Sequence, residues 1–298
     1  MTMPPLYKYL SVKGAKLTLG NRKFKHAKPS DFNDTEDLTI QNIFPEETEA
    51  ALTSISRQLI DTILDHLNDV PTCSSPRKEQ IVCLQNLFLS NPDVAPLIKV
   101  EMANERVEQI YDVEHMRARV GAYVSEINEF MQDFRILCVT TLLDSEKMWT
   151  NYAENHKGIA LRIEPNLAKD SKFKLFRPVT YREKQPPFYA NTRDFIADSL
   201  FGDQEALAKV MVEKIIYTKT LEWEHESEYR LAIPLRQGEA PWDTLSYQPE
   251  EITELYLGRS MERADAGVIM EMAREVNPNI MISAAKRDAT GRIQFDRV

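Results

Sequence analysis

The spacing of apolar residues changes twice along this chain of 298 residues, and the change limits how the chain can fold. From about Pro45 to Phe134 the apolar residues recur three and four positions apart, as Leu52, Ile55 and Leu59 illustrate. This period is typical of helices that pack one face against a core. Short segments on both sides carry the residue types of strands instead. We therefore predict an α+β fold with an all-helical insertion over residues 45–134.

The flanking segments predict strands in a particular order. The pieces LYKYLSV, KLTL and KFKH, separated by Gly14 and by the Gly20-Asn21 turn signal, predict one strand followed by a hairpin. After the helical block we expect further strands at RILCVTTLL, GIALRIEP, RPVTYRE, YRLAIPL, ITELYLG, NIMISAA and RIQFDRV. Helices are expected at DSEKMWTNYAENH, ALAKVMVEKIIYTK and MERADAGVIMEMAREV.

The composition limits the class of protein. With 43% hydrophobic and 28% charged residues the chain is ordinary for a soluble globular protein. It contains no apolar run near the ~20 residues that cross a bilayer, and its first residues lack the apolar core of a secretory signal. We expect a cytoplasmic protein without a membrane partner. The five histidines show no metal-ligand spacing, so no metal site is predicted.

The charge is unevenly distributed. The formal net charge of −9 argues against a surface built simply to bind nucleic acid. Before Asp31, however, the chain carries seven Lys and Arg residues and no acid. This basic segment is either a solvated, lysine-rich pair of strands or the border of a pocket for a polyanion such as a dinucleotide.

Four glutamates alternate in the segment TLEWEHESEYRLAIP: Glu222, Glu224, Glu226 and Glu228. In a strand, residues two apart point to the same face, so Glu226 and Glu228 should project together. At about 4 Å and an effective dielectric near 20, two such charges repel by about 4 kcal/mol. Either the segment is an exposed loop in which Arg230 pairs with one glutamate, or the pair faces a cation or a transient positive centre.

A resemblance favours the second interpretation. Glu226-Ser227-Glu228 before an apolar strand resembles the catalytic glutamate segment of ADP-ribosyltransferases. The strand LYKYLS and the segment Val139-Thr140-Thr141 precede it in the order of that fold. The motifs Phe32-Asn33-Asp34, Met148-Trp149-x-x-Tyr152-Ala153 and Trp223-x-x-Glu226-x-Glu228-x-Arg230 resemble a bacterial family of unknown-function proteins that we relate to this fold.

The resemblance implies a fold and a site. The fold would be a core of mostly antiparallel strands split into two small sheets, and residues 1–298 would form one catalytic-type domain. NAD would be the substrate, with Glu228 catalytic and Glu226 supporting it. The residues that would bind NAD are Tyr7, Lys8, Tyr9, Asn33, Thr140, Thr141, Trp149, Tyr152 and Arg230. The first strand offers Tyr-Lys-Tyr where well-studied transferases have Arg or His, and Thr replaces Ser in the middle motif.

Carboxylates suit this chemistry. Cleavage of the nicotinamide–ribose bond creates an oxocarbenium-like centre, which a fixed carboxylate stabilises. Glu228 would accept a hydrogen bond from a ribose hydroxyl, and Glu226 would orient or deprotonate the acceptor. The acceptor would be a protein or a nucleic acid. Proteins of this kind often act as toxins or in defence against phage, so an antitoxin or inhibitor protein is a further expected partner.

Alternatives stay open from the sequence. The same fold could serve as a non-catalytic module that binds a nucleotide or a partner, or the enzyme could be an NAD glycohydrolase. Trp149 and Tyr152, three apart on a predicted helix, could be core residues. Asn33 and Asp34 could simply form a turn.

Overall fold

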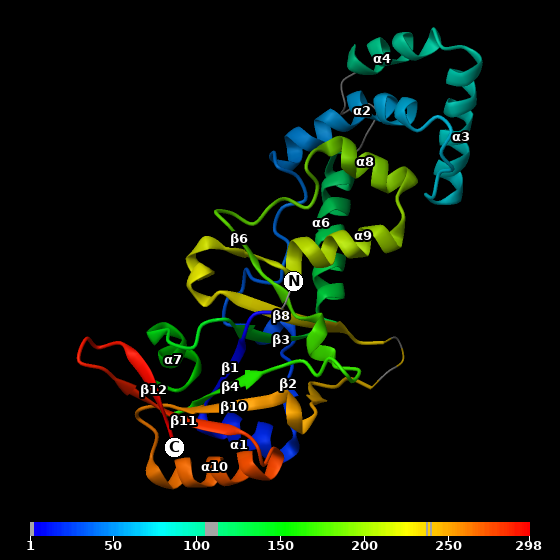
Figure 1. Cartoon of the computed structure of the whole chain (residues 1–298). Coiled ribbons are helices and arrows are strands. Elements are labelled where there is room, and N and C mark those ends of the chain that lie inside the picture. The colour runs from blue at the N-terminus through cyan, green and yellow to red at the C-terminus, as the bar shows by residue number, and fades with distance from the viewer. Residues whose placement is uncertain (1–2, 105–112, 237, 239) are drawn as a thin grey trace. The chain divides into compact units, whose positions relative to one another are not determined.

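The computed structural model describes residues 3–104, 113–236, 238 and 240–298 (Figure 1). The chain divides into two compact units, each built from segments that are separate in the sequence. The sheet unit comprises Met1–Asp37, Gln132–Glu183 and Tyr217–Val298, and the helical unit comprises Leu38–Met131 and Lys184–Ile216. The mixed α+β character that we predicted is confirmed.

In its described residues, the sheet unit contains strands β1 to β12, the helices α1, α7 and α10, and short 3₁₀ turns. The strands are β1 (Leu6–Leu10), β2 (Lys23–Lys25), β3 (Phe134–Thr140), β4 (Ile159–Ile163), β5 (Arg177–Pro178), β6 (Thr180–Arg182), β7 (Thr218–Thr220), β8 (Glu228–Pro234), β9 (Thr244–Ser246), β10 (Ile252–Leu257), β11 (Met281–Arg287) and β12 (Ile293–Arg297). The helices are α1 (Val12–Asn21), α7 (Glu146–Tyr152) and α10 (Arg263–Val276), and the 3₁₀ turns are η1 (Pro29–Asp31), η2 (Lys172–Leu175), η4 (Leu221–Glu226) and η5 (Pro249–Glu251).

Eight strands pair in one sheet, in the order β12-β11-β10-β4-β1-β3-β8-β5. Only the β10–β11 pair within it is parallel. Two further sheets have two strands each, β2 with β9 and β6 with β7. The expected division of the core into two small sheets is therefore wrong, although the expected antiparallel character is confirmed. The reason is that β4 pairs with both β1 and β10, so the C-terminal strands extend the same sheet.

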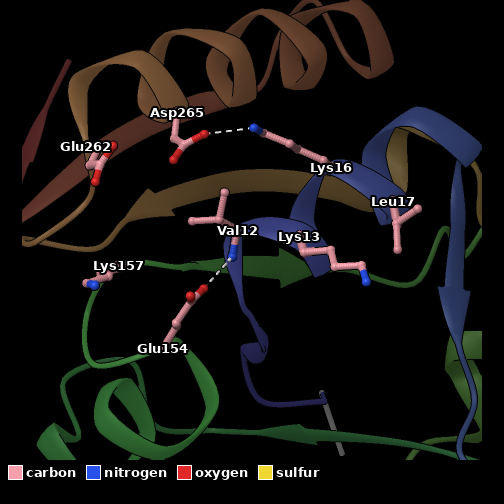
Figure 2. Close-up of a pocket in the computed structure, with 8 residues that line it drawn as sticks. All are labelled: Val12, Lys13, Lys16, Leu17, Glu154, Lys157, Glu262 and Asp265. Carbon is pink, nitrogen blue, oxygen red and sulfur yellow. Dashed lines mark hydrogen bonds and ion pairs between the residues drawn. The ribbon is translucent and has the colours of Figure 1, made fainter.

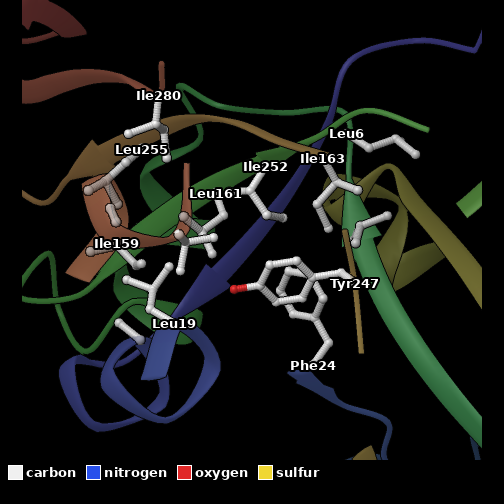
Figure 3. Close-up of a cluster of buried hydrophobic side chains, with 14 of the residues drawn as sticks. Leu6, Leu19, Phe24, Ile159, Leu161, Ile163, Tyr247, Ile252, Leu255 and Ile280 are labelled. Atoms are coloured by element: carbon white, nitrogen blue, oxygen red, sulfur yellow. The ribbon is translucent and has the colours of Figure 1, made fainter. Parts of the chain in front are cut away.

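The two faces of the large sheet bury different side chains. Helices α1 and α10 pack on one face, over aliphatic residues such as Leu161 and Leu255 (Figure 3). The other face carries Tyr9 of β1 under Trp149 of α7. Residues directly opposite on antiparallel strands share a face. The registers Tyr7–Thr140 and Thr140–Glu228 therefore place Glu228 on the same face as α7.

The N-terminal segment corrects one prediction. KLTL is not a hairpin strand, because it lies within helix α1. Ser11 caps this helix by accepting a hydrogen bond from the Gly14 N–H at 3.1 Å. Ala15 and Leu19, four positions apart, form its buried stripe. The helix ends at Arg22, whose φ of 51° reverses the chain direction into β2.

The helical unit has its own core. Its helices are α2 (Thr48–Asp65), α3 (Ser75–Ser90), α4 (Val94–Asn104), α6 (Val113–Met131), α8 (Thr192–Phe201) and α9 (Gln204–Met211), which continues into the π-helical turn η3 (Val212–Ile216). Buried side chains of α2, α3, α4 and α8 pack together, among them Ile63, Phe88 and Ile196. Residues 105–112 of the expected insertion lie outside the described residues.

The boundaries of the helical unit differ from the expected insertion in two respects. Phe134, expected at the end of the helical block, begins strand β3. Residues Lys184–Ile216 join the helical unit from a distant part of the sequence. Within the ranges that the structure describes, no helix is long and apolar enough to cross a membrane.

Candidate functional site

The four alternating glutamates separate into an exposed pair and a buried pair. Glu222 and Glu224 are exposed, whereas Glu226 and Glu228 retain only 4% and 5% of their exposure. The segment is not one strand, because Leu221–Glu226 forms a 3₁₀ turn. Ser227 follows with a φ of 43°, and β8 begins at Glu228. The two buried carboxylates therefore converge from both sides of a tight turn, not from one face of a strand as we expected.

Arg230 holds Glu228 and Asp37 together. Its Nε and Nη2 lie 2.9 and 3.0 Å from the two carboxylate oxygens of Glu228. Its Nη1 lies 3.0 Å from Asp37 Oδ1. The guanidinium is fully buried. It therefore makes a bidentate, charge-assisted contact with one carboxylate and a further pair of bonds with another.

Lys219 of β7 joins the same group. Its Nζ lies 2.7 Å from Glu226 Oε2 and 3.4 Å from Glu228 Oε2. We call Asp37, Lys219, Glu226, Glu228 and Arg230 the carboxylate cluster. Three carboxylates face two cations, so the cluster carries a formal excess of one negative charge. An excess negative charge in a buried site favours a cationic species.

The pKa values follow from burial and from these partners. Burial raises the pKa of Glu228, but the charge and hydrogen bonds of Arg230, with help from Lys219, lower it to about 2. Burial dominates at Asp37, whose pKa is raised despite its contact with Arg230. Burial lowers the pKa of Lys219, but the neighbouring carboxylates raise it overall. At neutral pH Glu228 is therefore a fixed anion.

Neighbouring side chains hold the turn between the glutamates. The Tyr152 hydroxyl donates to Glu226 Oε1, and the Thr140 hydroxyl donates to the Glu226 carbonyl at 2.6 Å. The Glu228 N–H donates to the Tyr181 hydroxyl at 2.8 Å. Burial and the hydrogen bond to Glu226 raise the pKa of Tyr152, so its hydroxyl stays a donor. The Thr141 N–H donates to the carbonyl of Ser227, at the centre of the turn.

Other predicted site residues lie in the apolar core beside the cluster. The Tyr9 hydroxyl donates to the carbonyls of Leu142 and Leu143. Trp149 is fully buried, and its Nε1–H donates to the Leu143 carbonyl at 2.8 Å. The two rings meet edge to face, 5.0 Å apart. Their hydrogen-bonding groups are therefore occupied, which supports the core interpretation of Trp149.

The remaining predicted residues, Tyr7, Lys8 and Asn33, differ in their burial. Tyr7 is buried and packs edge to face against Tyr256. Lys8 is half-buried, and its Nζ donates to the Cys138 carbonyl at 2.9 Å. Burial lowers the pKa of Lys8. Asn33 is exposed, although the ring of the preceding Phe32 lies 5.7 Å from the Arg230 guanidinium.

Sequence reasoning missed two members of the cluster, Asp37 and Lys219. Asp37 ends an acidic run that looks like a solvated surface, yet it is 6% exposed. Lys219 lies 4.5 Å from the Trp223 ring, at a spacing of four residues. Lys-x-x-x-Trp before the glutamates was the available signal. Among the described residues, no group of three or more His, Cys, Asp or Glu could hold a metal ion.

A surface hollow borders the basic N-terminal segment, where the sequence offered a polyanion pocket as one interpretation (Figure 2). This hollow of about 550 Å³ is lined by Lys13, Lys16 and Lys157, but also by Glu154, Glu262 and Asp265. Lys16 is paired with Asp265 at 2.7 Å. The mixed charge and this ion pair do not favour a polyanion. Lys13 and Lys16 lie on helix α1, not on a strand, whereas Lys23 and Lys25 lie on strand β2, which pairs with β9.

Comparison with protein-family models gives a match to part of the chain. Residues 148–231 match the family described as "Protein of unknown function (DUF2971)". This range covers under half of the chain and includes Trp149, Tyr152, both buried glutamates and Arg230, whereas Phe32-Asn33-Asp34 lies outside it. The expected similarity to an unknown-function family is therefore confirmed over this range. Neither the curated proteins nor the solved structures gave a match.

Proposed function

We propose that the chain is an ADP-ribosyltransferase that consumes NAD and uses Glu228 as its catalytic carboxylate. The observation that carries the proposal is a buried, ionised Glu228 beside Glu226, in a cluster with an excess negative charge. Such a site favours a substrate that becomes cationic in the transition state. The order of the motifs along the chain agrees with this role.

The residues would divide the chemistry as follows. The bond between nicotinamide and the ribose C1 breaks, and nicotinamide leaves with the bonding electrons. Glu228 stabilises the developing positive charge and accepts a hydrogen bond from a ribose hydroxyl. An acceptor nucleophile then bonds to C1 and gives its proton to Glu226, which Tyr152 holds in place.

Access to the carboxylates is part of this proposal. Because both glutamates are almost covered by protein, NAD would have to displace a neighbouring side chain. Tyr152 and Trp223 are only half-buried and contact Glu226 and Lys219, respectively. We therefore assign the entry side of the site to these two aromatic residues, which would also stack on the nicotinamide or adenine ring.

The test is to incubate the full chain with NAD and measure free nicotinamide by mass spectrometry. Glu228→Gln keeps the size of the side chain but removes its charge. We expect about a thousandfold loss of turnover, corresponding to roughly 4 kcal/mol of lost transition-state stabilisation. Glu224→Gln removes an exposed carboxylate from the same segment and should leave turnover unchanged. Equal turnover of Glu228→Gln and the unaltered chain would exclude the proposed role.

The second candidate is a binding module on the same fold. Both carboxylate oxygens of Glu228 are already bonded to Arg230, which is the contact expected of a structural ion pair. In that case NAD would give no nicotinamide, even with a cell extract as the source of acceptors, and the chain would bind a nucleotide or a partner without turnover.

Labelled NAD separates transfer from hydrolysis. A transferase leaves label on protein, RNA or DNA, whereas an NAD glycohydrolase releases free ADP-ribose. A role as a toxin or in phage defence would appear as growth arrest on expression. That arrest should be relieved by Glu228→Gln or by a neutralising partner protein.

A further inference from the structure

A second hollow lies in the sheet unit and contacts the opposite face of β8 from the carboxylate cluster. Its volume is about 170 Å³. Leu231, the neighbour of Arg230 in β8, lines it, and successive residues of a strand point to opposite faces. Phe173 and Tyr247 form part of its apolar wall. The lining also includes His26 and three charged residues, Asp170, Lys172 and Glu251, so two carboxylates and one ammonium give it a formal excess of one negative charge. We call it the His26 hollow; it is independent of the proposed transferase site.

His26 contributes a hydrogen-bond acceptor to this hollow. Its Nδ1 lies 3.1 Å from the Phe24 carbonyl, which can only accept, so Nδ1 carries the ring proton. Burial lowers the pKa of His26 to about 4, and the ring is therefore neutral at physiological pH. Nε2 is then a bare acceptor. It is buried and has no partner among the described residues, and the side chain is 1% exposed.

Glu251 contributes a second acceptor. Its Oε2 accepts the Gln248 N–H at 2.8 Å, but its Oε1 is buried and without a partner in the described parts of the chain. The residue is only 3% exposed. Buried polar atoms are almost always hydrogen-bonded, and an unmet one destabilises the fold. Gln248, which also lines the hollow, has a third such atom in its Oε1. Three residues of one lining that each carry an unmet acceptor therefore indicate a missing donor.

We propose that the His26 hollow binds a small organic cation with at least two N–H donors, such as a guanidinium or a primary ammonium group. The donors would satisfy His26 Nε2 and Glu251 Oε1, and the positive charge would pair with the carboxylate. Two bare acceptors repel an anion. The volume also limits the ligand, because sites for drug-sized molecules start at roughly 300 Å³.

The alternative occupant is water. One water molecule needs only about 10–15 Å³, so the hollow has room for several. Water carries no charge, however, and would leave the formal excess of negative charge in the lining uncompensated. The two occupants therefore differ in their response to a charged, donor-bearing probe.

The experiment follows the histidine ring nitrogens by ¹⁵N NMR in the full chain. The chain has five histidines, so His26→Gln assigns the His26 signals. We expect methylguanidinium chloride to shift the His26 Nε2 signal saturably. Tetramethylammonium chloride, which has the same charge but no N–H donor, should not shift it. Glu251→Gln should weaken methylguanidinium binding by about tenfold or more, because it removes the charge that the cation pairs with.

Glu250→Gln is the matched control. Glu250 precedes Glu251 but its side chain is 45% exposed and pairs with Lys169 outside the hollow, so binding should be unchanged. Circular dichroism checks that each variant is folded. If Glu251→Gln does not fold, methylguanidinium binding to His26→Gln is measured by calorimetry instead. We expect this variant to lose saturable binding. The proposal would be overturned by equal responses to both probes, or by unchanged binding in folded Glu251→Gln and His26→Gln. A crystal soaked in methylguanidinium that shows only water in the hollow would also overturn it.

Discussion

Arg230 is the residue on which the carboxylate cluster depends most. It is fully buried and bonds two carboxylates, so its removal would leave Glu228 and Asp37 without their main counter-charge. Breaking a buried ion pair by removing one partner costs about 3–5 kcal/mol. We therefore expect Arg230→Met to lower the free energy of unfolding by that amount in urea denaturation followed by tryptophan fluorescence.

The control for Arg230 is Arg263→Met on α10. Arg263 is exposed, so the same change should alter the free energy of unfolding by no more than about 0.5 kcal/mol. If Arg230→Met is as stable as the unaltered chain, the cluster contributes nothing to folding through its charges.

The pH dependence of stability has a contribution from His26. Burial lowers its pKa from 6.5 to about 4, although the hydrogen bond to the Phe24 carbonyl opposes the shift. The unfolded chain therefore binds a proton at higher pH than the folded chain does. The resulting stability is fully present above about pH 6.5 and is lost as the pH falls towards 4, by on the order of 3 kcal/mol.

His26→Gln should remove this contribution. The amide can still donate to the Phe24 carbonyl, but it does not titrate. Urea denaturation between pH 7 and pH 4 should show a shallower loss of stability in the variant than in the unaltered chain. Comparing the two chains isolates His26 from His156, whose pKa burial also lowers. Parallel stability curves would mean that His26 is not the titrating group.

The sequence allowed the buried glutamates to be predicted but not all of their partners. Alternating carboxylates before an apolar strand are unusual enough to be singled out, and Arg230 lies two residues further on. Asp37 approaches Arg230 only through tertiary structure, because 193 positions separate the two residues in the chain. Lys219 lies seven positions before Glu226, but the sequence pattern places it at the end of a helix. Local composition cannot distinguish a buried acid in an acidic run from its solvated neighbours. Tyr9 and Trp149 lie in an apolar core cluster, and the sequence could not show this because a stacking aromatic and a core aromatic have the same sequence pattern.

At the scale of elements, two glycines hold β4 and β10 in place. The Gly258 N–H donates to the Gly158 carbonyl at 2.9 Å. A Cβ on Gly158 would lie 2.0 Å from the Leu10 carbonyl oxygen, a contact that the backbone of β1 cannot relieve without moving. We therefore expect Gly158→Ala to destabilise the sheet unit by more than about 3 kcal/mol, as measured by thermal unfolding.

Gly267→Ala is the matched substitution in α10. A Cβ at this helical position would contact nothing within 4 Å. Alanine is favoured over glycine within a helix, so this variant should be more stable by roughly 0.5–1 kcal/mol. Gly158→Ala and Gly267→Ala should therefore change the stability in opposite directions. This difference tests whether the Leu10 carbonyl lies as close to Gly158 as the structure shows. If Gly158→Ala leaves the stability in thermal unfolding unchanged, β1 and β4 are not packed as closely as described.

Most strands could be predicted because each combines β-branched residues with nearby turn signals. β3, β4, β8, β10, β11 and β12 and the helices α7 and α10 lie where the sequence placed them. The helix expected at ALAKVMVEKIIYTK overlaps α9 and η3, but its last residues, Thr218 and Lys219, belong to strand β7. α1 was missed because KLTL alternates apolar and polar residues, as a strand does. The decisive information was instead the cap at Ser11 and the i, i+4 pair Ala15 and Leu19. A short segment can satisfy both periods, and tertiary packing then decides between them.

At the scale of the whole molecule, the division into units could not be predicted from the sequence. The helical period over residues 45–134 identifies most of the helical unit. The second segment of the unit, Lys184–Ile216, is separated from the first by β3, α7, β4, β5 and β6. Its helix α8 packs on α2 through Ile196 and Leu200. The spacing of apolar residues in a helix identifies its buried face, but it does not indicate which distant helix packs against that face.

Separate cores should give each unit its own unfolding transition. Trp149, Trp223 and Trp242 all belong to the sheet unit, so tryptophan fluorescence reports on that unit alone. Ile63 is fully buried in the core of the helical unit, and Ile269 is fully buried in the core under α10. Truncating either to alanine removes comparable apolar contacts, at a cost of about 2–5 kcal/mol.

The pair Ile63→Ala and Ile269→Ala therefore separates the units. Ile269→Ala should lower the urea midpoint of the fluorescence transition. Ile63→Ala should leave that midpoint in place and lower the midpoint of far-UV circular dichroism, to which the helices of the helical unit contribute strongly. If Ile63→Ala lowers both midpoints equally, the two cores unfold as one cooperative domain. In that case ligand binding in the sheet unit would also stabilise the helical unit by mass action, because a ligand stabilises everything that unfolds together with its site.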